Sequence, residues 1–262
     1  MTALFDMELR SARRDRAART GSDRFLLDRV FEDCLERVSL VQRGFRSCLL
    51  IGCPNPAWPE QLSRFAQSIH VQDPGRLFAG AAGGSRETED EWSPPSSTYD
   101  LVLAIGTLDT VNDLPAALRA VRSAMFDDGL FIGAMSGGHT LPQLRRAMQA
   151  ADAAVGVASP HVHPRIEPAA VAPLLESSGF HAPVVDVDRV QVAYSSLSAL
   201  VADLRLMAAT NILLSRPKQP LGIAAYRAAV EAFGASEEAR TVETFEILHF
   251  AAWTSAGAGK QH

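Results

Sequence analysis

The chain lacks three features that would assign it to a broad class at once: a long apolar run, a cysteine framework and a basic excess. No stretch approaches the ~20 continuous apolar residues that cross a bilayer, and no secretory leader pattern opens the chain. Three cysteines in 262 residues are an odd number and too few for a disulfide framework. A net charge of -5 argues against general binding of nucleic acid or anionic membranes. We therefore expect a soluble protein of the reducing cytoplasm, with no transmembrane segment and no nucleic-acid partner.

The first half of the chain has the pattern of an α/β protein. With 47% hydrophobic residues, the chain can bury one sizeable core, so one domain is expected. Leu114–Met125 has helical periodicity and lies between two apolar runs. Short apolar runs of this kind are typical of parallel strands buried on both faces; they are Cys48–Gly52, Ser68–Asp73, Tyr99–Gly106 and Gly129–Met135. The alternation predicts a doubly wound, mostly parallel sheet of about seven strands with helices on both faces.

The second half adds two strands and four helices, and two of these helices lie between the strands. Residues 183–194 alternate like a half-solvated strand, and residues 242–253 form a last strand, so the closing pair could be antiparallel. Four helices are expected, at Leu141–Ala151 with Thr140 as N-cap, Pro168–Ser178, Leu197–Ala209 and Ala224–Phe233. We divide the chain into an N-terminal helical arm, residues 1–45, and a main domain, residues 46–262, with a helical insertion at about 197–235.

The arm begins with a basic stretch that has two interpretations. Asp6, Glu8 and Asp15 interrupt it, whereas transit peptides are poor in acids. One interpretation is a solvated helix of mixed charge. The other is an arginine-rich lid: arginines between Phe5 and Arg19 would complement an anionic guest at the mouth of a pocket.

Several stretches together resemble a known family. They are FDMELRSARRDRAAR, TVNDLPAALRAV, DDGLFIGAMSGGHTLPQLR, SPHVHPRIEP, VVDVDRVQVAYSSLSALVADLRLMAATN and TFEILHFAAW. They resemble the methyltransferase-like complex I assembly factor of mitochondria and its bacterial relatives, with biotin-synthesis carrier methyltransferases as more distant cousins. The resemblance implies the Rossmann-like class I methyltransferase fold, S-adenosylmethionine as cofactor, and a respiratory complex subunit as partner. The mitochondrial member is described as hydroxylating an arginine of such a subunit with S-adenosylmethionine.

The turn after the first strand departs from the family's D-x-G-C-G-x-G pattern. Gly52 and Cys53 are present, but Leu50 stands in place of the acid, and Pro54 and Pro56 replace two glycines. Leucine cannot pair with the cofactor's ammonium, and proline has neither the free φ nor the NH group that the glycines supply. We therefore predict that S-adenosylmethionine binding is weak or absent.

The resemblance places other residues of this chain at the cofactor. Asp73 would accept hydrogen bonds from ribose, although an Asp in QDPG is also a plain turn former. Trp92 lies in the loop expected at adenine, although core packing would explain it equally. Asp109 and Thr110 replace a family His and Trp. The complete predicted cofactor set is Ile51, Gly52, Cys53, Asp73, Glu91, Trp92, Ile105 and Gly106.

A last group of residues could face a substrate or partner: Arg13, Arg14, His161, His163, Arg205 and Asn211. His161 and His163 could also form half of a metal site, but no companion ligand completes it, and we predict no metal. The stretch SGGHT is either an anion-binding nest or a flexible turn. Cys53 is either a nucleophile or simply buried.

No catalytic residue can be named from the sequence. Two functions remain open. The first is an S-adenosylmethionine-dependent enzyme that acts on a small acid or on a protein, where it could modify an arginine. The second is a non-catalytic assembly or interaction factor for a respiratory complex.

Overall fold

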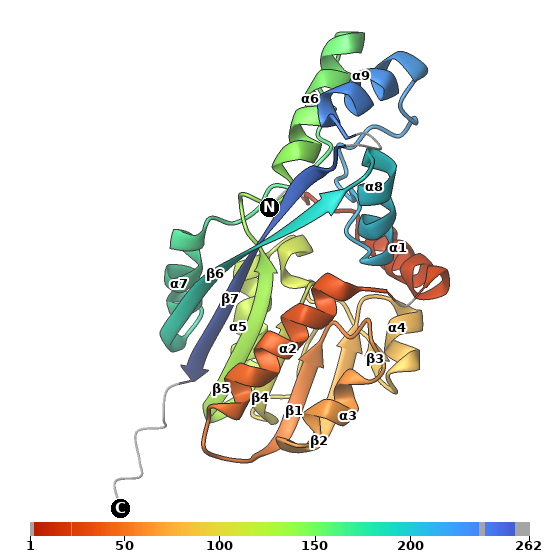
Figure 1. Ribbon diagram of the computed structural model, residues 1–262. Helices are drawn as coiled ribbons and strands as arrows, with labels where there is room; N and C mark the ends of the chain where they lie inside the picture. The colour runs from red at the N-terminus through yellow and green to blue at the C-terminus, as the bar shows by residue number, and fades with distance from the viewer. Residues whose placement is uncertain (1–2, 22, 236–238, 255–262) are drawn as a thin grey trace, which may run out of the picture.

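A seven-stranded sheet with helices on both faces forms the centre of the protein. The computed structural model describes residues 3–21, 23–235 and 239–254 (Figure 1). The strand order is β3-β2-β1-β4-β5-β7-β6, and only the pairs that involve β7 are antiparallel. The strands are β1 (Phe45–Ile51), β2 (Ala66–Asp73), β3 (Ser85–Arg86), β4 (Tyr99–Ile105), β5 (Met125–Ser136), β6 (Phe180–Tyr194) and β7 (Thr241–Thr254). The predicted fold class and the antiparallel closing pair are thereby confirmed.

The helices cover the sheet because successive strand residues point to opposite faces. Leu50 packs in one hydrophobic cluster with Phe31 of α2, whereas Leu49 packs in another with Leu118 of α5. Both leucines are fully buried, which explains the continuous apolar run in β1. The helices are α1 (Met7–Thr20), α2 (Phe25–Ser39), α3 (Trp58–Leu62), α4 (Arg76–Ala81), α5 (Leu114–Ala124), α6 (Pro142–Val155), α7 (Pro168–Ser177), α8 (Leu197–Leu206) and α9 (Ile223–Phe233), with a short 3-10 helix η1 (Leu108–Thr110).

The longest two strands extend past the sheet and carry a helical lobe. β7 pairs with β5 only from Ile247 onward, but its pairing with β6 continues to Tyr194 and Thr241. Helices α6, α8 and α9 gather around this ribbon at the top of Figure 1. We call these helices and the ribbon the upper lobe. Its α8 and α9 are the helices expected between the last two strands.

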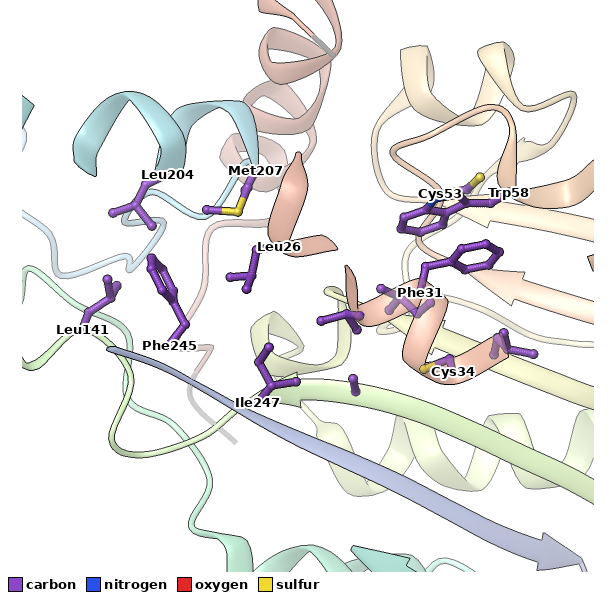
Figure 2. Close-up of a cluster of buried hydrophobic side chains, with 14 of the residues drawn as sticks. Leu26, Phe31, Cys34, Cys53, Trp58, Leu141, Leu204, Met207, Phe245 and Ile247 are labelled. Atoms are coloured by element: carbon purple, nitrogen blue, oxygen red, sulfur yellow. The ribbon is translucent and has the colours of Figure 1, made fainter. Parts of the chain in front are cut away.

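One hydrophobic cluster joins the upper lobe to the sheet. Figure 2 shows Leu204 and Phe245 of the lobe on one side and Trp58 on the other, with Leu26 of α2 between them. Leu26, Leu204 and Phe245 are each less than a tenth exposed. The lobe and the sheet therefore share one core, as expected for one domain.

The N-terminal arm is docked at its first residues. Phe5 forms an antiparallel bridge with Leu213, and the Asp6 amide donates to the Ile212 carbonyl at 2.9 Å. The Asp6 carboxylate caps α1 by accepting from the Leu9 amide. Because Arg10 and Arg14 are buried, the interpretation of the arm as a solvated helix is wrong.

The predicted start of α6 was also wrong. Leu141, in a left-handed conformation, is the N-cap, and α6 begins at Pro142. The Thr140 hydroxyl instead donates to the Glu246 carbonyl at 2.9 Å and fixes the turn to β7. Among the helices of residues 3–21, 23–235 and 239–254, none is long and apolar enough to cross a membrane.

Candidate functional site

The carboxyl ends of β1, β2 and β4 meet where the strand order reverses, which is where open α/β sheets bind ligands. Gly52 follows β1 with a φ of 83°, and a Cβ there would lie 2.3 Å from the Ile105 carbonyl oxygen. Only glycine fits this position. The edge thus brings together residues 51–53, Asp73 and residues 105–106, all of which belong to the predicted cofactor set, while their binding of a cofactor stays a prediction. We call this region the cleft.

The Asp73 carboxylate at the centre of the cleft is fully engaged by the protein itself. Arg14 of α1 donates from Nε to Oδ1 at 2.7 Å and from Nη2 to Oδ2 at 2.5 Å. The backbone amides of Cys53 and Gly75 donate to the same carboxylate at 2.8 and 2.7 Å. Burial lowers the pKa of Arg14, but Asp73 outweighs it and holds that pKa above its ordinary value. Arg14, predicted to face a substrate or partner, therefore occupies the position where ribose hydroxyls were expected.

A second buried ion pair closes the cleft beside the first. Arg10 donates to both carboxylate oxygens of Glu89, at 2.7 and 3.2 Å, and to the Thr107 carbonyl at 2.7 Å. Burial raises the pKa of Glu89, but Arg10 more than offsets this and holds it below its ordinary value. Glu91, the predicted residue of this loop, is exposed, and Trp92 packs partly buried on the α5 side of the core.

A third pair lies on the side of the cleft toward the upper lobe. Arg165 Nη1 donates to Asp109 Oδ2 at 2.5 Å, and both side chains are at least nine-tenths buried. Burial would raise the pKa of Asp109, but Arg165 holds it below its usual range. Asp109 stands where the family pattern has a histidine. The residue that replaces the histidine is thus paired with Arg165.

The space that remains in the cleft is small. A cavity of about 90 Å³ lies between α1, the end of β4 and the upper lobe, and its lining includes Arg10, Arg14, Gly106, Thr110 and Ser136. Sites for drug-sized ligands and cofactors are typically ~300 to 1,000 Å³. The cavity of the cleft is smaller than this range.

The turn after β1 packs against α2. Asn55 Nδ2 and Trp58 Nε1 both donate to Oδ1 of Asp28, at 2.8 and 2.9 Å. The Trp58 ring stacks on Phe31 with centroids 4.4 Å apart. Pro54 is buried in this turn. The turn is thus fixed by protein contacts in place of ligand contacts.

The cysteine of this turn is not set up as a nucleophile. Cys53 is buried, and burial raises the pKa of its thiol to about 12. A thiol with this pKa is protonated near neutral pH. All three cysteines are free and buried.

A second, larger cavity lies beside the cleft. It has a volume of about 890 Å³ and shares Leu141, His163, Arg165 and Leu204 with the small cavity of the cleft. Its basic residues are Arg13, His161, His163, Arg165, Arg205, Arg216 and Lys218, and no aspartate or glutamate of the described residues lines it. We call it the basic cavity. Arg13, Arg205 and Asn211, predicted to face a substrate or partner, lie here.

The two histidines of this cavity have protein partners. His161 Nε2 lies 2.8 Å from Asp152 Oδ1, and His163 Nε2 accepts from the Ile212 amide at 2.9 Å. Burial, and next Arg165, lower the pKa of His163 to about 4, so its ring is neutral at pH 7. The structure therefore gives them separate roles in hydrogen bonding.

One group elsewhere has metal-binding side chains close together: Asp33 of α2, Asp188 of β6 and His249 of β7, whose ligand atoms lie within 4.8 Å. Arg29 already donates to Asp188 at 3.1 Å. This cation neighbour opposes a metal ion at the same carboxylate.

The glycine turn after β5 also meets a carboxylate of the protein. The His139 amide donates to Glu246 Oε1 at 3.2 Å, and Arg189 Nε donates to Oε2 at 2.9 Å. Of the two interpretations of SGGHT, an anion-binding nest or a flexible turn, neither is settled, and the His139 amide there donates to a carboxylate of the protein.

Sequence reasoning did not single out Arg165, Arg216 and Lys218, and it missed that Arg10 of the predicted lid pairs with Glu89. Arg10 and Glu89 are 79 positions apart, and no local pattern links them. Arg216 and Lys218 lie in a short polar break that resembled an ordinary loop.

Known proteins similar to this chain agree with its fold. The family described as "Methyltransferase domain" matches residues 23–182. The mitochondrial arginine-hydroxylase NDUFAF5 of Danio rerio is 30% identical over 95% of this chain and 82% of its own length. A malonyl-[acyl-carrier protein] O-methyltransferase of Laribacter hongkongensis is 28% identical over 69% of this chain and 60% of its own. The solved structure of N-methyltransferase NodS of Bradyrhizobium japonicum, in complex with S-adenosyl-L-homocysteine, superposes with a TM-score of 0.54 at 14% identity, covering 94% of this chain and 98% of NodS.

Proposed function

Because the chain belongs to the methyltransferase-domain family, we propose that it keeps the family's fold while its own arginines occupy the cofactor cleft, and that it acts as a non-catalytic assembly or interaction factor for a respiratory complex. The observation that carries this proposal is the Asp73 carboxylate, whose two oxygens accept four hydrogen bonds from Arg14, Cys53 and Gly75. No free acceptor is left there for ribose hydroxyls.

The residues present do not fit S-adenosylmethionine. Leu50, in the position of the family's acid, is fully buried in the core, and Pro54 has no NH group to donate. The cleft cavity of about 90 Å³ is well below the size of a cofactor site.

We propose a respiratory complex as partner on two grounds, the similarity to the arginine-hydroxylase relative and the resemblance of the motifs. The three free, buried thiols support a reducing compartment such as the cytoplasm.

Calorimetry with S-adenosylmethionine and S-adenosylhomocysteine tests the closed cleft. We expect Kd at least ~100-fold weaker than that of an intact relative, since a lost charge-assisted hydrogen bond alone accounts for about 1.5 to 3 kcal/mol. A low-micromolar Kd for the unchanged protein would overturn the proposal.

A rescue series locates the obstacle. The triple variant Leu50→Asp, Pro54→Gly, Pro56→Gly restores the family pattern, and adding Arg14→Ser frees Asp73. If α1 occupies the site, the quadruple variant binds S-adenosylhomocysteine more tightly than the triple variant. Equal affinities would show that Arg14 does not obstruct the cofactor, provided that circular dichroism shows both variants folded.

A cellular experiment separates this proposal from an enzyme. In a strain that lacks the chain, we expect reduced activity of the respiratory NADH dehydrogenase, restored by the wild type. Ser136→Val places a larger side chain in the cleft cavity and should restore activity equally if no cofactor enters. Loss of rescue by a folded Ser136→Val protein would favour the second candidate, a cofactor-dependent arginine hydroxylase or methyltransferase. That candidate is supported by the 30% identity over 95% of the chain and by the retained glycine geometry at Gly52.

A further inference from the structure

The basic cavity has a charge that the protein does not neutralise. Arg13, Arg205 and Lys218 have no ion pair with any residue in the described part of the chain. Arg216 pairs with Asp6 at 3.2 Å, outside the lining, and Arg165 pairs with Asp109. We propose that the basic cavity binds an anionic head group, a carboxylate or a phosphate, that carries an apolar chain.

Three residues that line the cavity have a buried donor without a hydrogen-bond partner in the described structure. Arg165, only 5% exposed, lines the cavity, and its Nε has no hydrogen-bond partner. Arg13 Nε and Thr210 Oγ1 are also buried without partners in the described structure. A buried donor left unpaired costs free energy, and an anion with several acceptor oxygens would satisfy such donors together.

The arginines also repel one another. Burial lowers the pKa of Arg13, and the charges of Arg16, Arg216 and Arg205 lower it further. Among the described groups that shift the pKa of Arg13, none is a carboxylate that offsets these effects. A bound anion would relieve this repulsion, which is a physical reason for one to be recognised here.

The walls of the same cavity are apolar. Leucine, valine, methionine and tyrosine side chains line it together with the basic groups, namely Leu141, Leu144, Met148, Val162, Leu197, Val201, Leu204, Leu221 and Tyr226. Its volume of about 890 Å³ lies in the range of small-molecule sites. Cations over apolar walls match an amphiphilic anion better than a free inorganic ion or a neutral lipid.

The basic cavity shares part of its lining with the cleft cavity, but neither Arg14 nor Asp73 lines it, so the anion-binding proposal does not rest on their pair. Cofactor binding and anion binding are measured separately, so failure of one proposal is distinguishable from failure of the other.

The binding experiment uses the full chain and ten-carbon probes below their micelle concentrations. Decanoate and decyl phosphate carry the two anionic head groups. Decanol has the same chain without a charge, and decyltrimethylammonium has it with a positive charge. Inorganic phosphate has the charge without the chain. We expect at least one decyl anion to bind with one-to-one stoichiometry, at least about tenfold tighter than decanol, decyltrimethylammonium or inorganic phosphate. The affinity should fall as salt is raised, since Arg205 and Lys218 are exposed.

Matched variants assign the site. Arg13→Gln and Arg205→Gln should each weaken the decyl anion about tenfold, whereas Arg119→Gln, at an exposed position on α5, should leave the affinity unchanged. Val201→Asn should weaken the decyl anion several-fold without affecting inorganic phosphate.

Three results would overturn the proposal. In the first, neither decyl anion binds saturably. In the second, decanol or decyltrimethylammonium binds as tightly as the decyl anions. In the third, Arg119→Gln weakens the decyl anion as much as Arg13→Gln does. Melting curves of the variants separate loss of binding from loss of folding.

Discussion

The cleft and the basic cavity are neighbours that differ in whether their arginines form ion pairs. In the cleft, Arg10, Arg14 and Arg165 each have a buried carboxylate. In the basic cavity, Arg13 and Arg205 have none among the residues that the structure describes. Paired charges stabilise a closed structure, whereas unpaired arginines can bind an anion from solution. The difference distinguishes a site that the protein has filled from one that it leaves open.

The largest expected effect comes from breaking the central pair of the cleft. Arg14→Met leaves the Asp73 carboxylate buried without its cation, so we expect a loss of about 3 to 5 kcal/mol in the free energy of unfolding. Urea denaturation measures it. Arg16→Met, on the exposed side of the same helix, is the control and should change stability by less than ~0.5 kcal/mol. A similar small change in Arg14→Met would mean that the pair does not hold α1 in place.

The next effect depends on pH at His163, between the two regions. Its pKa is lowered from 6.5 to about 4 in the folded protein, with Arg165, Arg145 and Asp109 as its charged neighbours. The unfolded chain therefore binds more protons below pH 6.5, and stability falls as pH drops from 6.5 toward 4, by up to about 3 kcal/mol. Unfolding measured from pH 8 to 4 in wild type and His163→Gln checks this. The loss should be smaller in the variant, and parallel pH profiles would contradict the assignment.

A smaller effect tests how closely α1 packs on the cleft. A Cβ at Gly75 would lie 2.6 Å from Arg14 Cβ, whereas one at Gly80 would meet nothing within 4 Å. We expect Gly75→Ala to destabilise the protein by about 1 to 3 kcal/mol through overpacking. Gly80→Ala, in helix α4, should stabilise it by about 0.5 to 1 kcal/mol. Thermal unfolding compares the two, and the same sign for both would refute the close packing of α1.

The smallest effect sharpens the other side of the comparison. Asp6→Asn removes the carboxylate that pairs with Arg216 at 3.2 Å while keeping a good N-cap for α1. The cavity then gains one unpaired cation, and decanoate or decyl phosphate should bind about two- to fourfold more tightly. Calorimetry at low salt would detect this change. Weaker binding would argue against an anionic head group.

Much of the fold could be predicted because its central strands are buried on both faces. The apolar run Cys48–Gly52 has no polar alternation, and that is what two helix-covered faces impose on β1. β3 could not be predicted, since its two residues, Ser85 and Arg86, are too few to show a period. The N-cap of α6 was misplaced because Thr140 is engaged by Glu246, a contact between residues 106 positions apart.

The strand ends that meet at the cleft could be predicted from the sequence, but the contacts of their side chains could not, and the binding roles of these residues stay a prediction. The strand ends placed Gly52, Asp73 and Gly106 at one edge, as parallel topology requires. That Asp73 receives Arg14 could not be predicted, because arginines of a mixed-charge helix have the same local pattern in solvent as in a buried ion pair. Arg14 of the arm thus pairs with a carboxylate of the same chain, whereas the anionic guest expected at the mouth of a pocket stays a prediction.

The docking of the arm also has a consequence for the order of folding during synthesis. Asp6 pairs with Arg216, 210 residues later, and Phe5 bridges Leu213. At ribosomal rates of about 5 to 20 residues per second, these partner residues are synthesised about 10 to 40 s after the arm. Before that, Asn112 can already hold the first residues, since its Oδ1 accepts from the Leu4 and Phe5 amides, so the arm docks in two steps, first on the half of the chain that forms the cleft and last on the segment after α8.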